Sequence, residues 1–190
     1  MYLVKRLTQQ DEFNTYEEHF MNSLGNEARL KTNALGEAYF KSSQVYALVD
    51  AQGEMVAGYI LGMSKPYRLI SFVPIEKITE TLEKFELNNC CEIVCVWKKK
   101  TMSKADTAKY LWPNIFNNFL ETKKQFLLGH NQNPKLDKRY GILAPRTLYY
   151  GLSTHQLPSR LILYSRFRIK LLYFIAKHIV ANFLQLKAKI

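Results

Sequence analysis

CCEIVCVW, residues 90–97, is a nearly uninterrupted apolar run in the middle of a 190-residue chain. A run of this length, apolar at both alternating positions, is typical of a strand buried on both faces of a sheet. Glu92 is its single charged residue. We therefore expect residues 90–97 to form the central strand and Glu92 to be a buried carboxylate.

The residues before this strand predict helices first and strands second. Phe13, Tyr16 and Phe20 recur at steps of three and four, which predicts a helix, and Gly53 lies in a short link that suits a hairpin. In chain order we expect strand 1–8, helices 9–24 and 27–40, hairpin strands 44–50 and 54–63, a further strand 67–73 and helix 75–87.

The residues after the central strand predict a second alternation of helix and strand. Ser103 can cap a helix with Asp106 three residues on, and Pro113 must kink or restart that helix. The later expected elements are strand 125–131, a short helix over 134–140, and strands 147–153 and 160–165. This order predicts an α/β (α+β) fold with one mixed sheet flanked by helices.

The segment LLGHNQNPKLDKRYG, residues 127–141, places Asn133 after a strand and Tyr140 seven residues later. With the order of elements over residues 1–168, this spacing resembles the GNAT superfamily of acyl-CoA-dependent N-acyltransferases. The resemblance implies a mostly antiparallel sheet, with Asn133 in the donor site and Tyr140 protonating the departing thiolate. CEIVCVW also bears a weaker likeness to acyl-homoserine-lactone and long-chain N-acyl amino acid synthases, whose Glu-Ile is matched by Glu92 and Ile93.

The resemblance also implies where the acyl donor binds. A glycine-containing pyrophosphate loop should follow the central strand, but this chain has KKKTMSKAD without glycine. Amides at the helix start and lysine charges can hold phosphates instead, and amides near Val96 would hold the thioester carbonyl. The donor-binding residues expected in this region are Val96, Lys98, Lys99, Lys100, Ser103 and Lys104.

Two further residues are candidates for catalysis. Desolvation in a central strand would raise the pKa of Glu92 toward the range of a general base, although a structural ion pair would also explain this residue. His130 ends the strand before Asn133, where α/β sheets gather ligands, and a surface or capping histidine is the alternative. The expected function is acyl transfer from acyl-CoA or an acyl carrier protein to an amine.

The charge is concentrated at the C-terminal end. Residues 138–190 contain ten basic and no acidic residues, whereas residues 1–137 carry a net charge of +1. This asymmetry favours an anionic partner, such as an acidic carrier protein, an anionic membrane or, ranked lower, nucleic acid stacked on the aromatic residues. A non-catalytic protein of the same fold that binds nucleic acid or membrane is therefore the alternative function.

The last residues predict a separate element. Residues 166–190 read as a basic amphipathic helix, because lysines fall on one side and Leu171, Ile175 and Phe183 on the other. We expect a domain over 1–165 followed by this helix, which would dock on the domain or on a second subunit, or lie on a membrane.

The cysteines and the absence of common motifs bear on the cellular compartment and on the classes of enzyme that remain. Cys90, Cys91 and Cys95 lack a disulfide framework, which favours the cytoplasm, either free or at the inner membrane face. Cys91 and Cys95 would share a strand face roughly 13 Å apart, too far for one metal ion. We expect no metal, and there is no P-loop, GxGxxG, HExxH or GxSxG motif.

Overall fold

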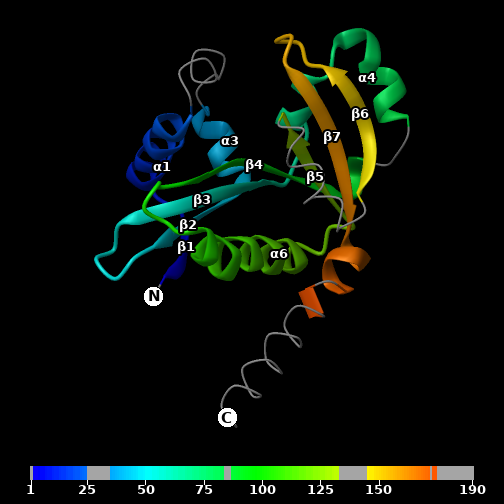
Figure 1. Ribbon diagram of the computed structural model, residues 1–190. Coiled ribbons are helices and arrows are strands. Elements are labelled where there is room, and N and C mark those ends of the chain that lie inside the picture. The colour runs from blue at the N-terminus through cyan, green and yellow to red at the C-terminus, as the bar shows by residue number, and fades with distance from the viewer. Residues whose placement is uncertain (1, 25–34, 84–86, 133–144, 172, 175–190) are drawn as a thin grey trace.

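The computed structural model describes residues 2–24, 35–83, 87–132, 145–171 and 173–174. Its centre is a seven-stranded sheet in the order β1-β2-β3-β4-β5-β7-β6 (Figure 1). Only β4 and β5 are parallel, and every other neighbouring pair is antiparallel. The strands are β1 (Leu3–Leu7), β2 (Ser43–Val49), β3 (Met55–Gly62), β4 (Cys90–Lys98), β5 (Phe126–Asn131), β6 (Arg146–Leu152) and β7 (Pro158–Ser165).

Helices cover both faces of the sheet. Alternating strand residues divide between two apolar cores, so that Val45 and Ala47 of β2 enter the first and Tyr46 and Leu48 the second. The helical elements are α1 (Gln10–Ser23), α3 (Glu37–Lys41), η1 (Arg68–Phe72), α4 (Ile75–Leu82), η2 (Leu87–Asn89), α5 (Lys104–Asp106), η3 (Thr107–Leu111) and α6 (Trp112–Glu121). The first core contains residues of α1, α3 and η1, and the second contains residues of α6. The predicted mixed sheet flanked by helices is confirmed.

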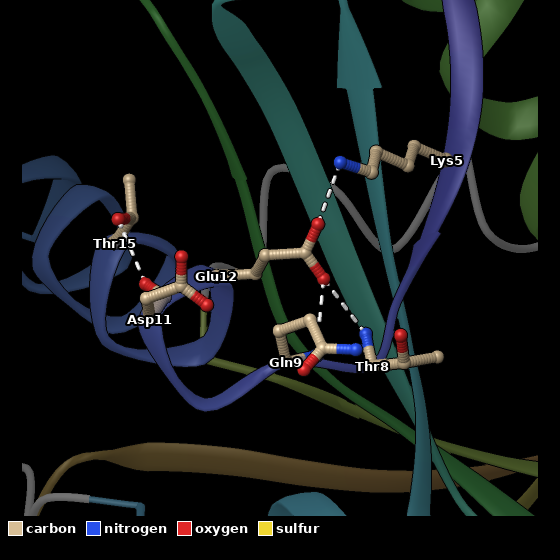
Figure 2. A network of polar contacts seen from close by, with 6 residues as sticks. All are labelled: Lys5, Thr8, Gln9, Asp11, Glu12 and Thr15. Carbon is tan, nitrogen blue, oxygen red and sulfur yellow. Dashed lines mark hydrogen bonds and ion pairs between the residues drawn. The ribbon is translucent and has the colours of Figure 1, made fainter.

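Helix α1 starts where the sequence predicts it. The Glu12 carboxylate accepts hydrogen bonds from the backbone N–H groups of Thr8 (2.9 Å) and Gln9 (3.1 Å). It also pairs with the Lys5 ammonium at 2.6 Å, as Figure 2 shows. Glu12 thereby satisfies the backbone N–H groups just before the helix, and its ion pair with Lys5 links α1 to β1. The face predicted to be apolar is buried through Phe13, Tyr16 and Phe20.

The helical stretch after β4 contains the expected break. Ser103 caps it, because its hydroxyl oxygen accepts from the Asp106 N–H at 2.9 Å. Residues 107–111 form a π-helical turn that ends two residues before Pro113, which has no N–H to donate. The Asn114 side chain donates to the Tyr110 carbonyl at 2.6 Å and so partners a backbone acceptor beside the break. Both predictions for Ser103 and Pro113 are confirmed.

Two predicted elements differ from the structure. Residues 67–73 do not continue the sheet: Arg68–Phe72 form the 3-10 helix η1, because two of its amide groups bind a side chain of β4. Of the second predicted helix, over 27–40, residues 35 and 36 are not helical and the helix α3 begins at Glu37, while residues 25–34 lie outside the described residues.

The C-terminal segment after β7 is helical over residues 166–171 and 173–174. Within the described residues, none of the helices combines the length and the apolar character needed to span a bilayer.

Candidate active site

The candidate site lies where the two parallel strands separate. β4 and β5 are paired only at Cys90–Phe126, Cys91–Leu127 and Glu92–Leu128. Beyond these pairs β4 continues to Lys98 and β5 to Asn131, and Figure 1 shows the two parts of the sheet diverging there. The unpaired ends are the carboxyl ends of parallel strands, which is where α/β sheets bind ligands.

A β-bulge shapes β4 at this point. Ile60 of β3 pairs with Val94, but Gly58 pairs with Trp97, so Cys95 and Val96 both lie opposite Tyr59. Cys95 has a φ of +52°, a left-handed conformation that is uncommon for a residue with a side chain. The bulge therefore gives β4 a fixed irregularity just after its last pair with β5.

Tyr16 of α1 holds the bulge in place. Its hydroxyl donates a hydrogen bond of 2.8 Å to the carbonyl oxygen of Cys95. Burial raises the pKa of Tyr16 well above its usual value, so the hydroxyl remains a donor. In a planar trans peptide the C=O and the following N–H point in opposite directions. The N–H of Val96 therefore points away from Tyr16, on a residue whose side chain is exposed.

Glu92 is fully buried, and both of its carboxylate oxygens accept hydrogen bonds. One accepts from the Tyr39 hydroxyl and the Arg68 N–H, each at 2.8 Å, and the other from the Leu69 N–H at 2.8 Å. A Cβ atom at Gly62 of β3 would lie 2.7 Å from Glu92 Cγ, so glycine is needed beside it. Burial raises the pKa of Glu92, while these donors oppose the rise. The geometry makes Glu92 an anchor for the start of η1.

His130 is held at the other end of η1. Its ring stacks on Phe72 with centroids 4.4 Å apart, and its Nε2 lies 2.7 Å from Ser159 Oγ. Burial lowers the pKa of His130 to about 4, so the ring is neutral at physiological pH. The β6–β7 loop completes this contact, because Thr154 N–H donates to the Phe72 carbonyl at 3.1 Å. Glu92 and His130 thus fix opposite ends of one element.

Two lysines of the loop after β4 make contacts within the chain. Lys98 Nζ donates to the Met102 carbonyl, and Lys99 Nζ pairs with Glu54, both at 2.8 Å. Lys100 and Lys104 are exposed. The structure therefore leaves Lys100 and Lys104 with the more accessible charges, and it brings the loop to the carboxyl end of β4.

Comparison with known proteins identifies the architecture. No family model and no curated protein matches the chain. FeeM, an N-acyl amino acid synthase from uncultured soil microbes, matches with 15% identity and a TM-score of 0.64 over 87% of this chain and 91% of that one. MesI, a CoA-dependent acyl-homoserine lactone synthase, matches with 11% identity and a TM-score of 0.66 over 90% and 95% of the two chains. An acetyltransferase of the GNAT family from Staphylococcus aureus Mu50 matches with 10% identity and a TM-score of 0.58 over 87% and 99%.

The chain has the GNAT fold. The resemblance inferred from the order of elements is thereby confirmed for the architecture. Asn133 and Tyr140, whose spacing supported that inference, lie outside the described residues.

Of the three cysteines of this GNAT-fold chain, Cys90 and Cys91 are buried and Cys95 is partly buried. Burial raises the pKa of each of the three to about 12. The prediction that Cys91 and Cys95 share a face is wrong, because the bulge turns Cys95 into the first core while Cys91 lies in the second. Among the described residues no cluster of three or more His, Cys, Asp or Glu side chains could hold a metal ion.

Sequence reasoning missed the residues that support the site. Tyr16, Tyr39, Phe72 and Ser159 each contact a bulge atom or a predicted site residue. The helical pattern identified Tyr16 as an inward-facing residue, but no local signal indicates where its hydroxyl points.

Proposed function

We propose that this GNAT-fold chain is an acyltransferase that moves an acyl group from a thioester to an amine by direct attack. The observation that carries the proposal is the bulge at Cys95, which follows the last β4–β5 pair. Residues 93–98 of β4 have no β5 partner, and the described geometry directs the Val96 N–H away from α1. A backbone donor at a strand opening suits the stabilisation of a developing oxyanion.

The proposed reaction needs no covalent enzyme intermediate. The amine lone pair attacks the thioester carbonyl carbon, a C–N bond forms, and the carbonyl oxygen becomes an oxyanion that accepts from the Val96 N–H. Collapse of this intermediate breaks the C–S bond, and the thiolate takes a proton from Tyr140. The proton lost by the amine goes to water. Such a general acid contributes roughly 10²- to 10⁴-fold to the rate.

In this scheme Glu92 and His130 act as positioning residues. The Glu92 carboxylate already accepts three hydrogen bonds, and releasing one would leave a buried donor without a partner. His130 stacks on Phe72 and contacts Ser159. Both residues support η1, which we propose as one wall of the acceptor site.

The proposed donor and acceptor classes are supported by charge and by the structural neighbours. Acyl-CoA is the first donor to test, because MesI is described as CoA-dependent, and an acyl carrier protein is the second. Amino acids are the first acceptors to test, because FeeM is an N-acyl amino acid synthase. Lys100 and Lys104, with Ser103 and Asn133, are the proposed contacts to the donor.

The test is an incubation of the full chain with acetyl-CoA, long-chain acyl-CoA or an acyl carrier protein loaded with the same chain, together with single amino acids. Thiol release and the mass of the acylated amine report transfer. Tyr140→Phe should lower turnover at saturating donor while donor affinity stays nearly constant. Equal turnover in this variant removes Tyr140 from the mechanism, and no transfer to any amine contradicts the proposal.

The lysines offer a matched comparison for donor binding. Lys100→Gln and Lys104→Gln should each weaken donor binding and reduce its salt dependence, because both side chains are exposed. Lys99→Gln is the control, since its ammonium already pairs with Glu54. If all three substitutions weaken donor binding equally, Lys100 and Lys104 make no specific contact to the donor.

The second candidate function is a non-catalytic binding protein of the same fold. The loop over 98–106 favours it, because the loop contains no glycine and uses Lys98 and Lys99 in internal contacts. Parallel thermal-shift measurements with acyl-CoA and with an oligonucleotide separate the two functions. A ligand that binds only the folded chain stabilises it by about 2.7 kcal/mol at 100 times its dissociation constant.

A further inference from the structure

The C-terminal helix starts at a firmly anchored residue. Arg166 donates its backbone N–H to the Gln125 carbonyl at 2.7 Å, and its guanidinium donates to the carbonyls of Lys124 and Leu120. Three residues on, Ile169 is buried in the second core. The described part of the helix, drawn in orange below β7 in Figure 1, therefore has one face fixed to the domain.

The opposite face of this helix presents large apolar side chains to solvent. Phe167 is 75% exposed, Leu171 47% and Phe174 60%. A helix turns by about 100° per residue, so positions 167, 171 and 174 lie together, roughly opposite Ile169. A surface helix usually presents polar residues to solvent, but the solvent face of this helix carries an apolar stripe.

Positive charge flanks the apolar stripe on both sides. Arg168 and Lys170 are exposed and lie on either side of it in the same helical projection. Residues 138–190 contain ten basic and no acidic residues. An apolar stripe between cationic flanks fits an interface in which hydrocarbon lies beneath anionic groups.

We propose that the face formed by Phe167, Leu171 and Phe174 binds an anionic membrane surface. The two rings and the leucine side chain enter the boundary between headgroups and acyl chains, while Arg168 and Lys170 contact anionic headgroups. A second copy of the chain fits less well, because a two-fold contact through this helix brings cations against cations. The inference does not depend on the proposed acyl transfer.

The test is vesicle flotation of the full chain. The vesicles contain phosphatidylcholine alone or with rising fractions of phosphatidylglycerol, and no acyl donor is present. Binding should rise with the anionic fraction and fall as salt shortens the screening length. The variant Phe167→Gln/Leu171→Gln/Phe174→Gln should lower partitioning by at least about tenfold, because burial of each side chain is removed.

A matched control separates this face from apolar exposure in general. Tyr150→Gln/Leu152→Gln removes two exposed apolar side chains from β6 and should leave vesicle binding unchanged. Arg168→Gln/Lys170→Gln should bind less and show a weaker dependence on phosphatidylglycerol. Thermal melting of every variant confirms that the domain stays folded.

The same variants show which outcomes overturn the proposal. Wild-type chain that floats with neither kind of vesicle, or a triple variant that floats like wild type, contradicts it. A dimer in sedimentation that the triple variant loses, without vesicle binding, assigns the face to a second copy. Binding to an acyl carrier protein that the triple variant loses, again without vesicle binding, assigns it to an acidic protein.

Discussion

Replacing Tyr16 by phenylalanine tests whether α1 positions the bulge of β4. The substitution removes the hydroxyl that donates to the Cys95 carbonyl and keeps the ring. The ring packs edge-on against Trp97, with centroids 5.9 Å apart, and against Phe40 at 6.4 Å. These apolar contacts should survive, so the change isolates one hydrogen bond.

The expected loss of stability follows from the burial of the bond. An unsatisfied buried carbonyl costs about 1–3 kcal/mol, and the Cys95 carbonyl loses its Tyr16 donor. Without that bond the peptide that carries the Val96 N–H is free to turn. The N–H is then less well aligned with the oxyanion in the transition state. Complete loss of an N–H that stabilises the oxyanion costs roughly 10²- to 10³-fold in kcat. Misalignment of the Val96 N–H should cost less than this, about tenfold or more. KM should change little, because the acyl donor is still bound.

Tyr67→Phe is the matched control for this experiment. The Tyr67 hydroxyl donates to the carbonyls of Leu87 (2.9 Å) and Cys90 (2.6 Å), and Cys90 lies on the same strand away from the bulge. Urea denaturation should show comparable losses of stability in both variants, while steady-state kinetics should show a fall in kcat only in Tyr16→Phe. Equal kcat in the two variants, or wild-type kcat in Tyr16→Phe, would refute the reasoning.

Substitutions at three further positions test the site. Val96→Pro removes the proposed oxyanion donor and should lower kcat by roughly 10²- to 10³-fold, whereas Val96→Ala keeps the N–H and should retain most activity; equal rates in the two folded variants contradict the assignment. Because burial raises the pKa of Glu92 above 4.5, protonation of this carboxylate is more favourable in the folded chain than in the unfolded chain. Relative to Glu92→Gln, wild type should therefore gain stability in urea as pH falls from neutral toward 4.5, and a relative loss would show that the hydrogen bonds dominate. Because the pKa of His130 is lowered from 6.5 to about 4, stability from the neutral ring is full above pH 6.5 and lost as pH falls toward 4. His130→Asn should flatten that part of the stability profile, and an unchanged slope would exclude His130 as its source.

Local patterns were sufficient for most elements of the sheet. The apolar run at 90–97 predicted β4, and the link through Gly53 predicted the β2–β3 hairpin, because burial on a pleated surface imposes a period of two. The inward face of α1 was predicted for the same kind of reason, since a helix repeats every 3.6 residues. Burial of Glu92 also followed from its place in the central strand.

Contacts between distant residues decided what the local pattern could not. Residues 67–73 have the composition of a strand, yet the amides of Arg68 and Leu69 bind Glu92, which lies more than 20 residues away in the chain, and η1 forms instead. Burial of the same carboxylate was predicted, but nothing near it in the sequence indicates the three donors that it binds.

The central strand, the helical faces and the excess of positive charge after residue 137 could be predicted, because each depends on composition or on neighbours along the chain. The direction of the Cys95–Val96 peptide could not, because it depends on contacts between distant residues. The left-handed conformation of Cys95 costs energy for a residue with a side chain, and nothing in CCEIVCVW indicates it. The Tyr16 hydroxyl, brought to the bulge by the packing of α1 on the sheet, stabilises that conformation through a hydrogen bond between residues 79 positions apart.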